Sequence, residues 1–257
     1  MDLGIKDRVV LVTGGSRGLG RQAALALARE GAKVAICARS EEPIKKAVEE
    51  LKALGSTAMG VAVDITEGEG ARRLFDRVVS QLGPVEILVN NVGGGGGGDI
   101  SEVTEDQMKE AFELNLFGAM RIMKLAIPDM KVKGWGRIIN ISSIFGREYG
   151  GRLAYMTAKA ALIALTKHMA LTLAKEGILV NSVAPGSIAF PGGSWERFQR
   201  EQSPQVVKEF IDRNLPMGRF GWPEPVGDLV AFLASERASL ITGACINIDG
   251  GQSRSLI

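Results

Sequence analysis

The residues best suited to acid–base chemistry in this chain are a tyrosine and a lysine four positions apart. Tyr155 and Lys159 lie near the start of a long apolar stretch that is typical of a helix. A spacing of four places both side chains on one helix face, with about 5–6 Å between their Cβ atoms. An ammonium there favours the phenolate, so a phenol with an ordinary pKa of about 10 can exchange protons near neutral pH. The alternative is a tyrosine at the rim of a helix beside a solvated lysine.

Two hydroxyl groups precede this pair. A β-branched run at 138–141 ends in Ser142 and Ser143, and a glycine-rich loop then leads to the helix. The other tyrosine, Tyr149, has Leu153 four residues later and cannot form the same pair. The strand-end hydroxyls favour the catalytic interpretation of Tyr155.

A second pattern, far upstream, is suited to binding phosphate. Residues 8–13 are a nearly continuous apolar run, which is typical of a parallel strand buried on both faces. Residues 14–20 follow as GGSRGLG, and a helix then runs to Gly31. Free backbone N–H groups and the positive end of the helix dipole make such a turn an anion site. The glycine spacing differs from G-x-G-x-x-G, and the Gly-Lys-Ser/Thr of a P-loop is missing.

The residues after the second expected strand, 33–38, concern the choice of cofactor. An acidic residue there would bind an adenosine ribose, whereas an arginine accommodates a 2′-phosphate. This chain has Arg39 and Ser40 at that point, and Arg17 lies in the phosphate turn. The sequence favours NADP(H) over NAD(H), with two solvated surface arginines as the alternative.

Polar residues also follow the next two expected strands, 58–64 and 85–90. Asp64 is predicted either to cap the following helix or to accept a hydrogen bond from an adenine amino group. Asn90 and Asn91 precede a run of glycines at 93–98, which we expect to be mobile or ordered by a ligand.

The remaining candidates lie in the following helix and after the sixth strand. Thr104 and Gln107 form a plausible capping box for a long helix that contains Asn115. An amide at such an apolar position is either a satisfied core group or part of an active-site network. Ala-Pro-Gly-Ser follows the strand at 178–183, and the segment at 187–215 is a candidate lid.

Strands and helices alternate along the whole chain without a break in composition. This pattern predicts an α/β fold with one doubly wound, Rossmann-type parallel sheet of seven strands, in a single domain of residues 1–257. Ligands of such sheets bind beyond the carboxyl ends of the strands, where all the candidate residues above would meet.

Composition excludes several other classes. The 257 residues have a formal net charge of +2, with no basic patch for nucleic acid or an anionic membrane. Cys37 and Cys245 fall in expected strands and are predicted to pack in the core, without a disulfide framework or a metal site. The first residues do not resemble a signal peptide, and no apolar run reaches 18 residues, so we expect a cytoplasmic protein.

Taken in order, these motifs resemble those of the short-chain dehydrogenase/reductase family, close to its 3-oxoacyl-acyl-carrier-protein reductase branch. The resemblance covers essentially the whole chain, although Val92 stands where the family usually has alanine and the glycine run is unusual. It rests on Thr13, Gly14, Gly18, Gly20, Asn90, Asn91, Val92, Gly93, Asn115, Ser143, Tyr155, Lys159, Pro185 and Gly186.

The resemblance implies four catalytic residues. Tyr155 would be the general acid in carbonyl reduction, and Lys159 would bind the nicotinamide ribose and lower the pKa of Tyr155. Ser143 would polarise the substrate oxygen, and Asn115 would hold a water that links Lys159 to solvent. Ser143 fits the family's Ser-x-x-Gly pattern twelve residues before the tyrosine, whereas relatives with thirteen would select Ser142. A strand slipped by one residue would turn the side chain to the other face, which favours Ser143.

The resemblance also implies a nicotinamide cofactor, with Asp64 at the adenine and Asn90 near the adenosine half. The residues expected to bind it are Gly14, Ser16, Arg17, Gly18, Leu19, Gly20, Arg39, Ser40, Asp64, Ile65, Asn91, Val92, Gly93, Tyr155, Lys159, Pro185, Gly186 and Ile188.

The helix at 154–174 is apolar almost all round, which predicts burial against another subunit. The family resemblance suggests a homotetramer, and His168 on this helix is interpreted as structural.

The leading hypothesis is therefore an NADP(H)-dependent oxidoreductase that interconverts a carbonyl and a secondary alcohol. The substrate would be a 3-oxoacyl thioester, a steroid-like ketone or a sugar. A nucleotide-binding regulator without turnover is one alternative, and an epimerase or dehydratase on the same scaffold is another.

Overall fold

The computed structural model describes residues 2–256, and its centre is one parallel sheet of seven strands. The strand order is β3-β2-β1-β4-β5-β6-β7, and all neighbours pair in parallel. The strands are β1 (Val9–Thr13), β2 (Lys33–Ala38), β3 (Ala58–Ala62), β4 (Ile87–Asn90), β5 (Gly136–Ile141), β6 (Ile178–Pro185) and β7 (Cys245–Ile248). This is the doubly wound arrangement that the sequence predicts, although β3 ends two residues before Asp64 and β4 begins two residues after Val85.

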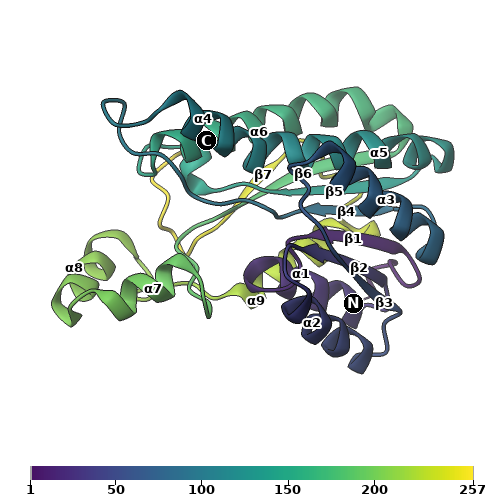
Figure 1. Ribbon diagram of the computed structural model, residues 1–257, viewed down its shortest axis with the longest axis horizontal. Coiled ribbons are helices and arrows are strands. Elements are labelled where there is room, and N and C mark those ends of the chain that lie inside the picture. Colours follow the sequence, from purple (N-terminus) through teal and green to yellow (C-terminus); the bar gives the residue numbers. More distant parts are fainter. Residues whose placement is uncertain (1, 257) are drawn as a thin grey trace.

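Helices cover both faces of the sheet (Figure 1). The α-helices are α1 (Gly18–Arg29), α2 (Glu41–Ala53), α3 (Gly68–Leu82), α4 (Glu105–Phe112), α5 (Gly118–Lys133), α6 (Leu153–Leu173), α7 (Ser194–Glu201), α8 (Pro204–Asn214) and α9 (Pro223–Leu233). Short helical turns are η1 (Glu113–Phe117), η2 (Ile144–Gly146), η3 (Ala174–Glu176) and η4 (Glu236–Ala238), of which η1 is a π-helix.

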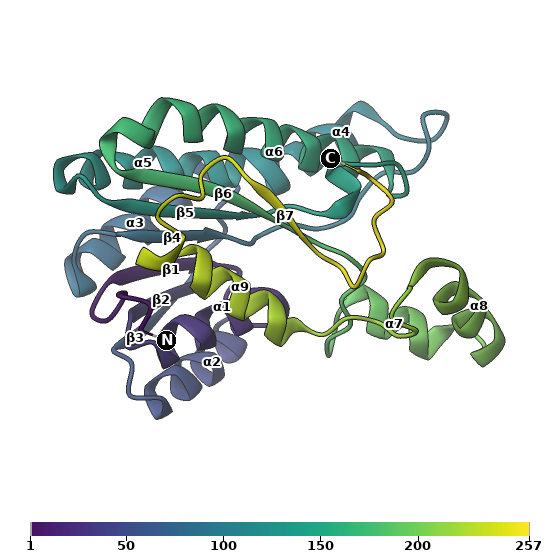
Figure 2. The same ribbon diagram turned by 180° about the vertical axis from the view of Figure 1, so that it is seen from behind.

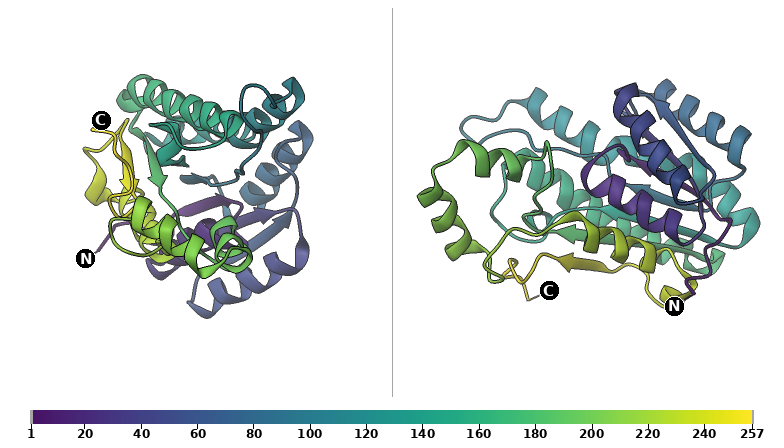
Figure 3. Two further views of the ribbon diagram at one scale, coloured as in Figure 1. Left: turned by 90° about the vertical axis from the view of Figure 1, so that its left-hand side faces the viewer. Right: turned by 90° about the horizontal axis from the view of Figure 1, so that it is seen from below.

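Each face of the sheet has its own apolar core. Side chains of α1, α2 and α9 pack against one face, and those of α3, α5 and α6 pack against the other. The first group of helices faces the viewer in the right-hand view of Figure 3. Alternate residues of β1 divide between the cores, because Val10 and Val12 belong to one and Leu11 to the other. This double coverage explains the continuous apolar runs of the central strands.

Helices α7 and α8 stand apart from these layers, beyond the carboxyl ends of the strands (Figures 1 and 2). Neither helix buries a residue fully. Their shared contact is an aromatic cluster in which the rings of Trp195 and Phe210 are 4.8 Å apart, and those of Phe210 and Phe220 stack at 5.7 Å. A segment with so little burial can move as a unit, as the lid expected at 187–215 must.

The structure also tests smaller expectations from the sequence. The capping box is confirmed, because the Thr104 hydroxyl accepts from the backbone N–H of Gln107 and the Gln107 side-chain oxygen accepts from the backbone N–H of Thr104. Cys37 is buried, but the expectation for Cys245 is wrong, since β7 is an edge strand and all its residues are only half-buried. Among the described residues, no helix is long and apolar enough to cross a membrane.

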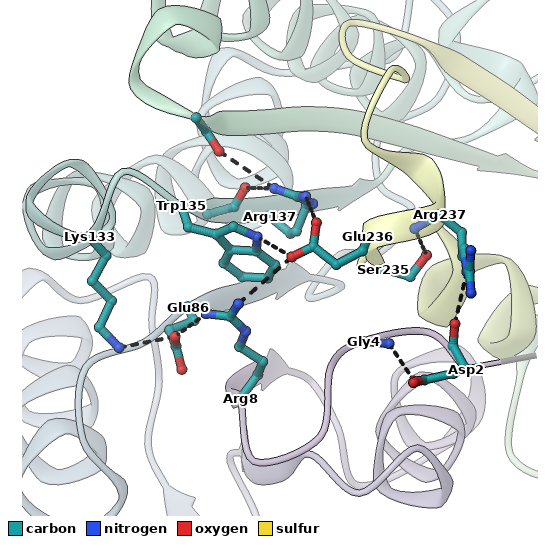
Figure 4. A network of polar contacts seen from close by, with 12 residues as sticks. Asp2, Gly4, Arg8, Glu86, Lys133, Trp135, Arg137, Ser235, Glu236 and Arg237 are labelled. Atoms are coloured by element: carbon teal, nitrogen blue, oxygen red, sulfur yellow. Dashed lines mark hydrogen bonds and ion pairs between the residues drawn. The ribbon is translucent and has the colours of Figure 1, made fainter.

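A charged network stabilises the end of the sheet where the strands begin (Figure 4). This end is far from the phosphate turn. Arg8 precedes β1, Glu86 precedes β4, and Trp135 precedes β5. The ring of Trp135 lies between the guanidinium groups of Arg8 and Arg137, at 3.9 and 4.3 Å from their Cζ atoms. Its Nε1 donates to Glu236 at 2.8 Å, which ties η4 to the sheet.

Glu86 should be a main contributor to the stability of this edge. Burial raises the pKa of its carboxyl, but hydrogen bonds from Arg8, Lys133 and the backbone of Val9 outweigh this effect and lower the pKa. A lowered pKa stabilises the fold at neutral pH, and this stabilisation is lost as the pH falls through the native pKa. Glu86→Gln should therefore cost about 2 kcal/mol at pH 7, and the difference from wild type should shrink near pH 3.

Urea unfolding at the two pH values measures this difference. Glu105→Gln is the control, because that side chain is exposed and pairs only with Lys109 across one helix turn. Its effect should be close to zero. A Glu86→Gln protein as stable as wild type at pH 7 would show that the network contributes nothing.

Candidate active site

A large cleft opens at the carboxyl ends of the strands. Its volume is about 1590 Å³, and the chain segments after β1 to β6 all contribute to its walls. Most residues expected to bind the cofactor line it, namely Gly14, Ser16, Arg17, Leu19, Arg39, Ser40, Asp64, Ile65, Asn91, Val92, Gly93, Tyr155, Lys159, Pro185, Gly186 and Ile188. Ser143 lines it as well, whereas Gly18, Gly20 and Asn115 lie just behind the wall.

The turn from β1 to α1 has the features of an anion site. Gly14 and Gly18 have φ angles of 66° and 55°, which other residues rarely adopt. Arg17 is the N-cap of α1, but its side chain makes no capping hydrogen bond, and the first helical turn has no acidic residue. The helix therefore presents its first N–H groups and its positive dipole end without a capping side chain, and a phosphate can satisfy them.

Asn91 holds this turn in place. Its side-chain nitrogen donates to the carbonyls of Thr13 and Gly14, both at 3.1 Å. A Cβ at Gly20 would lie 2.4 Å from the same nitrogen, so only glycine fits there. The asparagine after β4 thus supports the phosphate turn after β1.

Asn90 does not take the place that the sequence comparison with the family implies. Its side chain is buried and donates to the Oδ1 atom of Asn140 at 2.9 Å, inside the sheet layer. Asn140 in turn donates to the hydroxyl of Thr166 on α6. The resemblance implies that Asn90 helps to hold the adenosine half, but side chains of successive strand residues point to opposite sides, and of the two asparagines Asn91 is the one that lines the cleft.

The two arginines that the sequence singled out lie in the cleft near the ends of β1 and β2. Arg39 and Arg17 both line it. The Oδ1 atom of Asp64 accepts from the backbone N–H and the hydroxyl of Thr66, at 2.9 and 2.7 Å. The backbone hydrogen bond lowers the pKa of Asp64 despite the opposing effect of partial burial, and the hydroxyl of Thr66 and the charge of Arg39 lower it further. Asp64 is therefore an anion that shapes the turn before α3, and it does not act as the N-cap of that helix, which is Glu67.

The two serines after β5 point to different surroundings. The Ser142 hydroxyl donates to the carbonyl of Val183 and accepts from Ser182, both at 2.8 Å. The Ser143 hydroxyl accepts from the backbone of Phe145 and shares a hydrogen bond with Tyr155. The Ser142 hydroxyl is thus bonded to β6, whereas the Ser143 hydroxyl lies beside Tyr155.

Tyr155 and Lys159 lie on one face of α6, as the spacing predicts. Both line the cleft, and the Lys159 Nζ atom is 5.8 Å from the centre of the Tyr155 ring. That ammonium donates to the carbonyl of Ile141, the last residue of β5, at 2.8 Å. This bond fixes the start of α6 against the end of the central strand.

The predicted lowering of the Tyr155 pKa is wrong for this structure. Burial raises the pKa of the phenol, and the hydrogen bond with Ser143 opposes that rise only in part. Burial also lowers the pKa of Lys159 to about 8. The reason is that burial disfavours the charged form of each group, which is the phenolate of Tyr155 and the ammonium of Lys159. At neutral pH the tyrosine is therefore fully protonated.

Asn115 lies behind Lys159 at the π-helical turn η1. Its amide exchanges two hydrogen bonds with the backbone of Gly94, both at 3.1 Å, and donates to the carbonyl of Ala111 at 2.9 Å. A Cβ at Gly93 would lie 2.7 Å from the Asn115 Oδ1 atom and 2.9 Å from the Lys159 Nζ atom. Gly93 therefore allows the backbone after β4 to pass between these two side chains.

The rest of the glycine run is held at its far end only. A Cβ at Gly97 would lie 2.8 Å from Ala154, and the Gly98 carbonyl accepts from Leu153 at the first residue of α6. Gly95 and Gly96 have nothing within 4 Å of a Cβ, and Gly95 lines the cleft. The run thus bridges Asn115 and α6 across the mouth of the cleft.

Sequence reasoning placed Phe190 in the candidate lid but missed its contact with the phosphate turn. A Cβ at Gly18 would lie 2.6 Å from its ring, so the lid segment packs directly on the phosphate turn. Arg197 on α7 also lines the cleft. The only available signal was the position of both residues within the candidate lid, because contacts between distant loops depend on the tertiary fold.

Comparisons with known proteins agree with this architecture. Residues 8–202 match the family model described as short chain dehydrogenase. The chain is 37% identical over 243 residues to 3-oxoacyl-(acyl-carrier-protein) reductase FabG of Staphylococcus aureus strain Mu50, which covers 94% of this chain and 96% of that protein. A reductase of the same name from Aquifex aeolicus is 35% identical and covers 98% of this chain and 99% of that protein.

Solved structures of two similar proteins contain both a cofactor and a second small molecule. L-sorbose reductase from Gluconobacter frateurii, complexed with NADPH and L-sorbose, has a TM-score of 0.90 at 31% identity, with full coverage of both chains. A 7α-hydroxysteroid dehydrogenase, complexed with NADH and 7-oxo glycochenodeoxycholic acid, has a TM-score of 0.90 at 29% identity. That match covers 100% of this chain and 98% of the other. A sugar and a bile acid are thus both ligands of similar folds.

Proposed function

The chain belongs to the short-chain dehydrogenase family of NAD(P)-dependent oxidoreductases, and from this premise we propose that it is an NADP(H)-dependent carbonyl reductase. A 3-oxoacyl thioester is the first substrate class to test, since curated relatives at 35–37% identity carry that name. The observation that carries the proposal is the meeting of Ser143, Tyr155 and Lys159 in one cleft with an uncapped helix end. The reaction would take place within a single domain of residues 1–257, with residues 187–215 as the substrate lid.

The residues present fit a dinucleotide cofactor. The N-terminal end of α1 and the turn at residues 14–20 would hold the diphosphate of the cofactor. Asn91, Val92 and Gly93 would contact the rest of the cofactor. Lys159 would bind the nicotinamide ribose, and the segment of Pro185, Gly186 and Ile188 would lie at the nicotinamide end. When bound, the reduced cofactor supplies the hydride that the carbonyl carbon accepts.

The protein's own residues would supply the proton and position the substrate. The Ser143 hydroxyl would donate a hydrogen bond to the carbonyl oxygen and polarise it. Tyr155, which like any phenol with a pKa of about 10 or above is protonated at neutral pH, would transfer its phenolic proton to that oxygen as negative charge develops there. Lys159 would then stabilise the phenolate, and Asn115, which exchanges hydrogen bonds with the backbone of Gly94, would hold a water that links Lys159 to solvent. The products are a secondary alcohol and the oxidised cofactor.

An oxidation assay tests this function. NADPH consumption is followed with an acetoacetyl thioester, a keto sugar and a keto steroid, and each reaction is repeated with NADH. Turnover with at least one class supports the proposal, and preference for the thioester supports the named class. No turnover with any class, despite tight binding of NADPH, would favour a nucleotide-binding regulator.

Arg39 should determine the cofactor preference. Because a 2′-phosphate would form charge-assisted hydrogen bonds with its guanidinium, Arg39→Ala should raise the KM for NADPH by about 10-fold or more. The KM for NADH should not change. Steady-state kinetics with both cofactors measure the effect, and Arg72→Ala, at an exposed arginine paired with Asp76 on α3, is the control. Equal losses with both cofactors would show that Arg39 does not select the phosphate.

We also propose self-association as a homotetramer. Apolar side chains on the outer helices support it, because Leu171 on α6 is 71% exposed and Val132 on α5 is 89% exposed in the single chain. His168 lies on the same exposed side of α6 and does not line the cleft.

A further inference from the structure

The loop between β5 and α6 is tied to the C-terminal end of the chain. Residues 143–152 form this loop, which begins at Ser143 and ends just before Tyr155. On its inner side, Phe145, Gly150, Gly151 and Arg152 line the cleft. On its outer side, Arg147 and Glu148 contact the segment that starts at β7. The position of the loop therefore depends on residues about 100 positions later in the chain.

Glu148 makes the most concentrated of these contacts. One oxygen, Oε2, accepts three hydrogen bonds, from the Ser253 hydroxyl at 3.0 Å and from the backbone N–H groups of Arg254 and Ser255 at 2.8 Å each. Two successive N–H groups and a hydroxyl around one oxygen form an anion-binding nest. A carboxylate suits it best, since hydrogen bonds to an ionised acceptor are about twice as strong as neutral ones.

The contacting segment, residues 249–256, has no helix or strand, and we call it the C-terminal strap. Its shape is set by Asp249, which accepts from the backbone of Gly251 at 2.9 Å and of Ser253 at 2.7 Å. Figure 2 shows the chain running from the end of β7 towards the segment before α7, and then back to the start of α6. The strap thus runs between the segment after β6 and the loop before α6.

The strap also contacts the base of the lid. The Gln252 side-chain oxygen accepts from the backbone N–H of Ser187 at 2.7 Å, next to Pro185 and Gly186. A Cβ at Gly186 would lie 2.6 Å from that oxygen and 2.7 Å from the Asp249 Cβ, so strap and strand end are in close contact. One short segment therefore joins the Ser143 loop to the first residues of the lid.

We infer that Glu148 is a positioning residue, which holds the C-terminal strap and thereby fixes the Ser143 loop against the base of the lid. This inference rests on the proposed function for its kinetic consequences. Glu148 contacts neither cofactor nor substrate in this account. It acts by fixing the position of Ser143 relative to Tyr155. Small displacements of such groups lower the reaction rate strongly.

The test compares two variants and their combination with the wild-type enzyme. Glu148→Ala removes the acceptor, and truncation after Gln252 removes its three donors but keeps the contact with Ser187. Each should lower kcat by about 10-fold, without a change in the Kd for NADPH. The double variant should lose no more than either single variant, because both changes break the same interaction. Glu148→Gln, which retains an oxygen acceptor, should recover most of the rate, and Tyr149→Phe, at a 92% exposed neighbour, should have no effect.

Hydrogen–deuterium exchange gives a readout that does not depend on turnover. Amides at 144–152 should exchange faster in both Glu148→Ala and the truncated protein, while those of β1 and β4 should not change. Unchanged exchange in this loop overturns the inference, as do additive losses of kcat in the double variant. A wild-type protein that reduces no carbonyl would overturn the proposed function instead, and the exchange experiment would still decide the role of Glu148.

Discussion

Tyr155→Phe should lower kcat by about 10²–10⁴-fold, which is the usual contribution of a positioned proton donor. The substitution removes one oxygen atom from a half-buried side chain and keeps the ring that packs at the cleft wall. The Kd for NADPH, measured by fluorescence titration, should therefore stay near that of wild type. The loss should appear in kcat, because the proton is transferred only in the reacting complex.

Tyr149→Phe provides the matched control, since it makes the same chemical change at a 92% exposed position in the loop just before α6. Its kinetics should equal those of wild type. Near-normal turnover of Tyr155→Phe with any good carbonyl substrate would exclude Tyr155 as the proton donor.

Lys159→Met should abolish most of the activity and yet stabilise the fold. We expect a loss of about 10²-fold or more in kcat, because an ammonium that stabilises developing charge is removed. Burial lowers the pKa of Lys159 to about 8, so the native state at pH 7 holds an ammonium in an unfavourable environment. Removing it should add on the order of 2 kcal/mol, after allowance for the lost hydrogen bond to Ile141.

The pH dependence of this gain follows from the two pKa values of Lys159. Between about 8 in the native state and its ordinary value of 10.5, the unfolded chain binds more protons, so the stability of wild type rises with pH. The advantage of Lys159→Met over wild type should therefore be largest below pH 8 and should shrink towards pH 10. Thermal unfolding at pH 7 and pH 10 measures it. Lys167→Met, at an exposed lysine on the same helix, should show no such trend, and a destabilised Lys159→Met at pH 7 would contradict the account.

The sheet was predictable because its strands are long apolar runs between strong stop signals. β2 (Lys33–Ala38) was predicted with its observed bounds, since Gly31 ends the helix before it and polar residues follow it. The carboxyl end of β3 was predicted two residues too far, because Val63 and Asp64 continue the apolar and polar pattern after the ladder has ended. The π-helical form of η1, which contains Asn115 and its contact with Gly94, has no signature in the sequence.

The candidate site was predictable where a strand end places a single side chain in the cleft. Ser143 was chosen over Ser142 from the family's Ser-x-x-Gly pattern together with the strand register, and the two hydroxyls do face different partners. Asn90 shows the limit of this reasoning, because two adjacent asparagines give no signal as to which one faces the cleft. The pKa of Tyr155 shows another limit, since spacing indicates that a cation is near but not how much water both groups lose.

The contacts that sequence could not reveal all join segments far apart in the chain. Phe190 lies on Gly18, and Glu148 binds the backbone of Arg254 and Ser255. Each partner alone resembles an ordinary surface residue. Such pairs depend on where the fold brings loops together, which local patterns do not encode.

The most direct test of the central claim is to follow a labelled hydride. NADPH that carries deuterium at the transferable position is incubated with the best carbonyl substrate, and the alcohol product is analysed by mass spectrometry for wild type and Tyr155→Phe. The account predicts one deuterium on the carbinol carbon with wild type, and the same label formed far more slowly with Tyr155→Phe. Alcohol without deuterium, or equal rates for the two proteins, would contradict it.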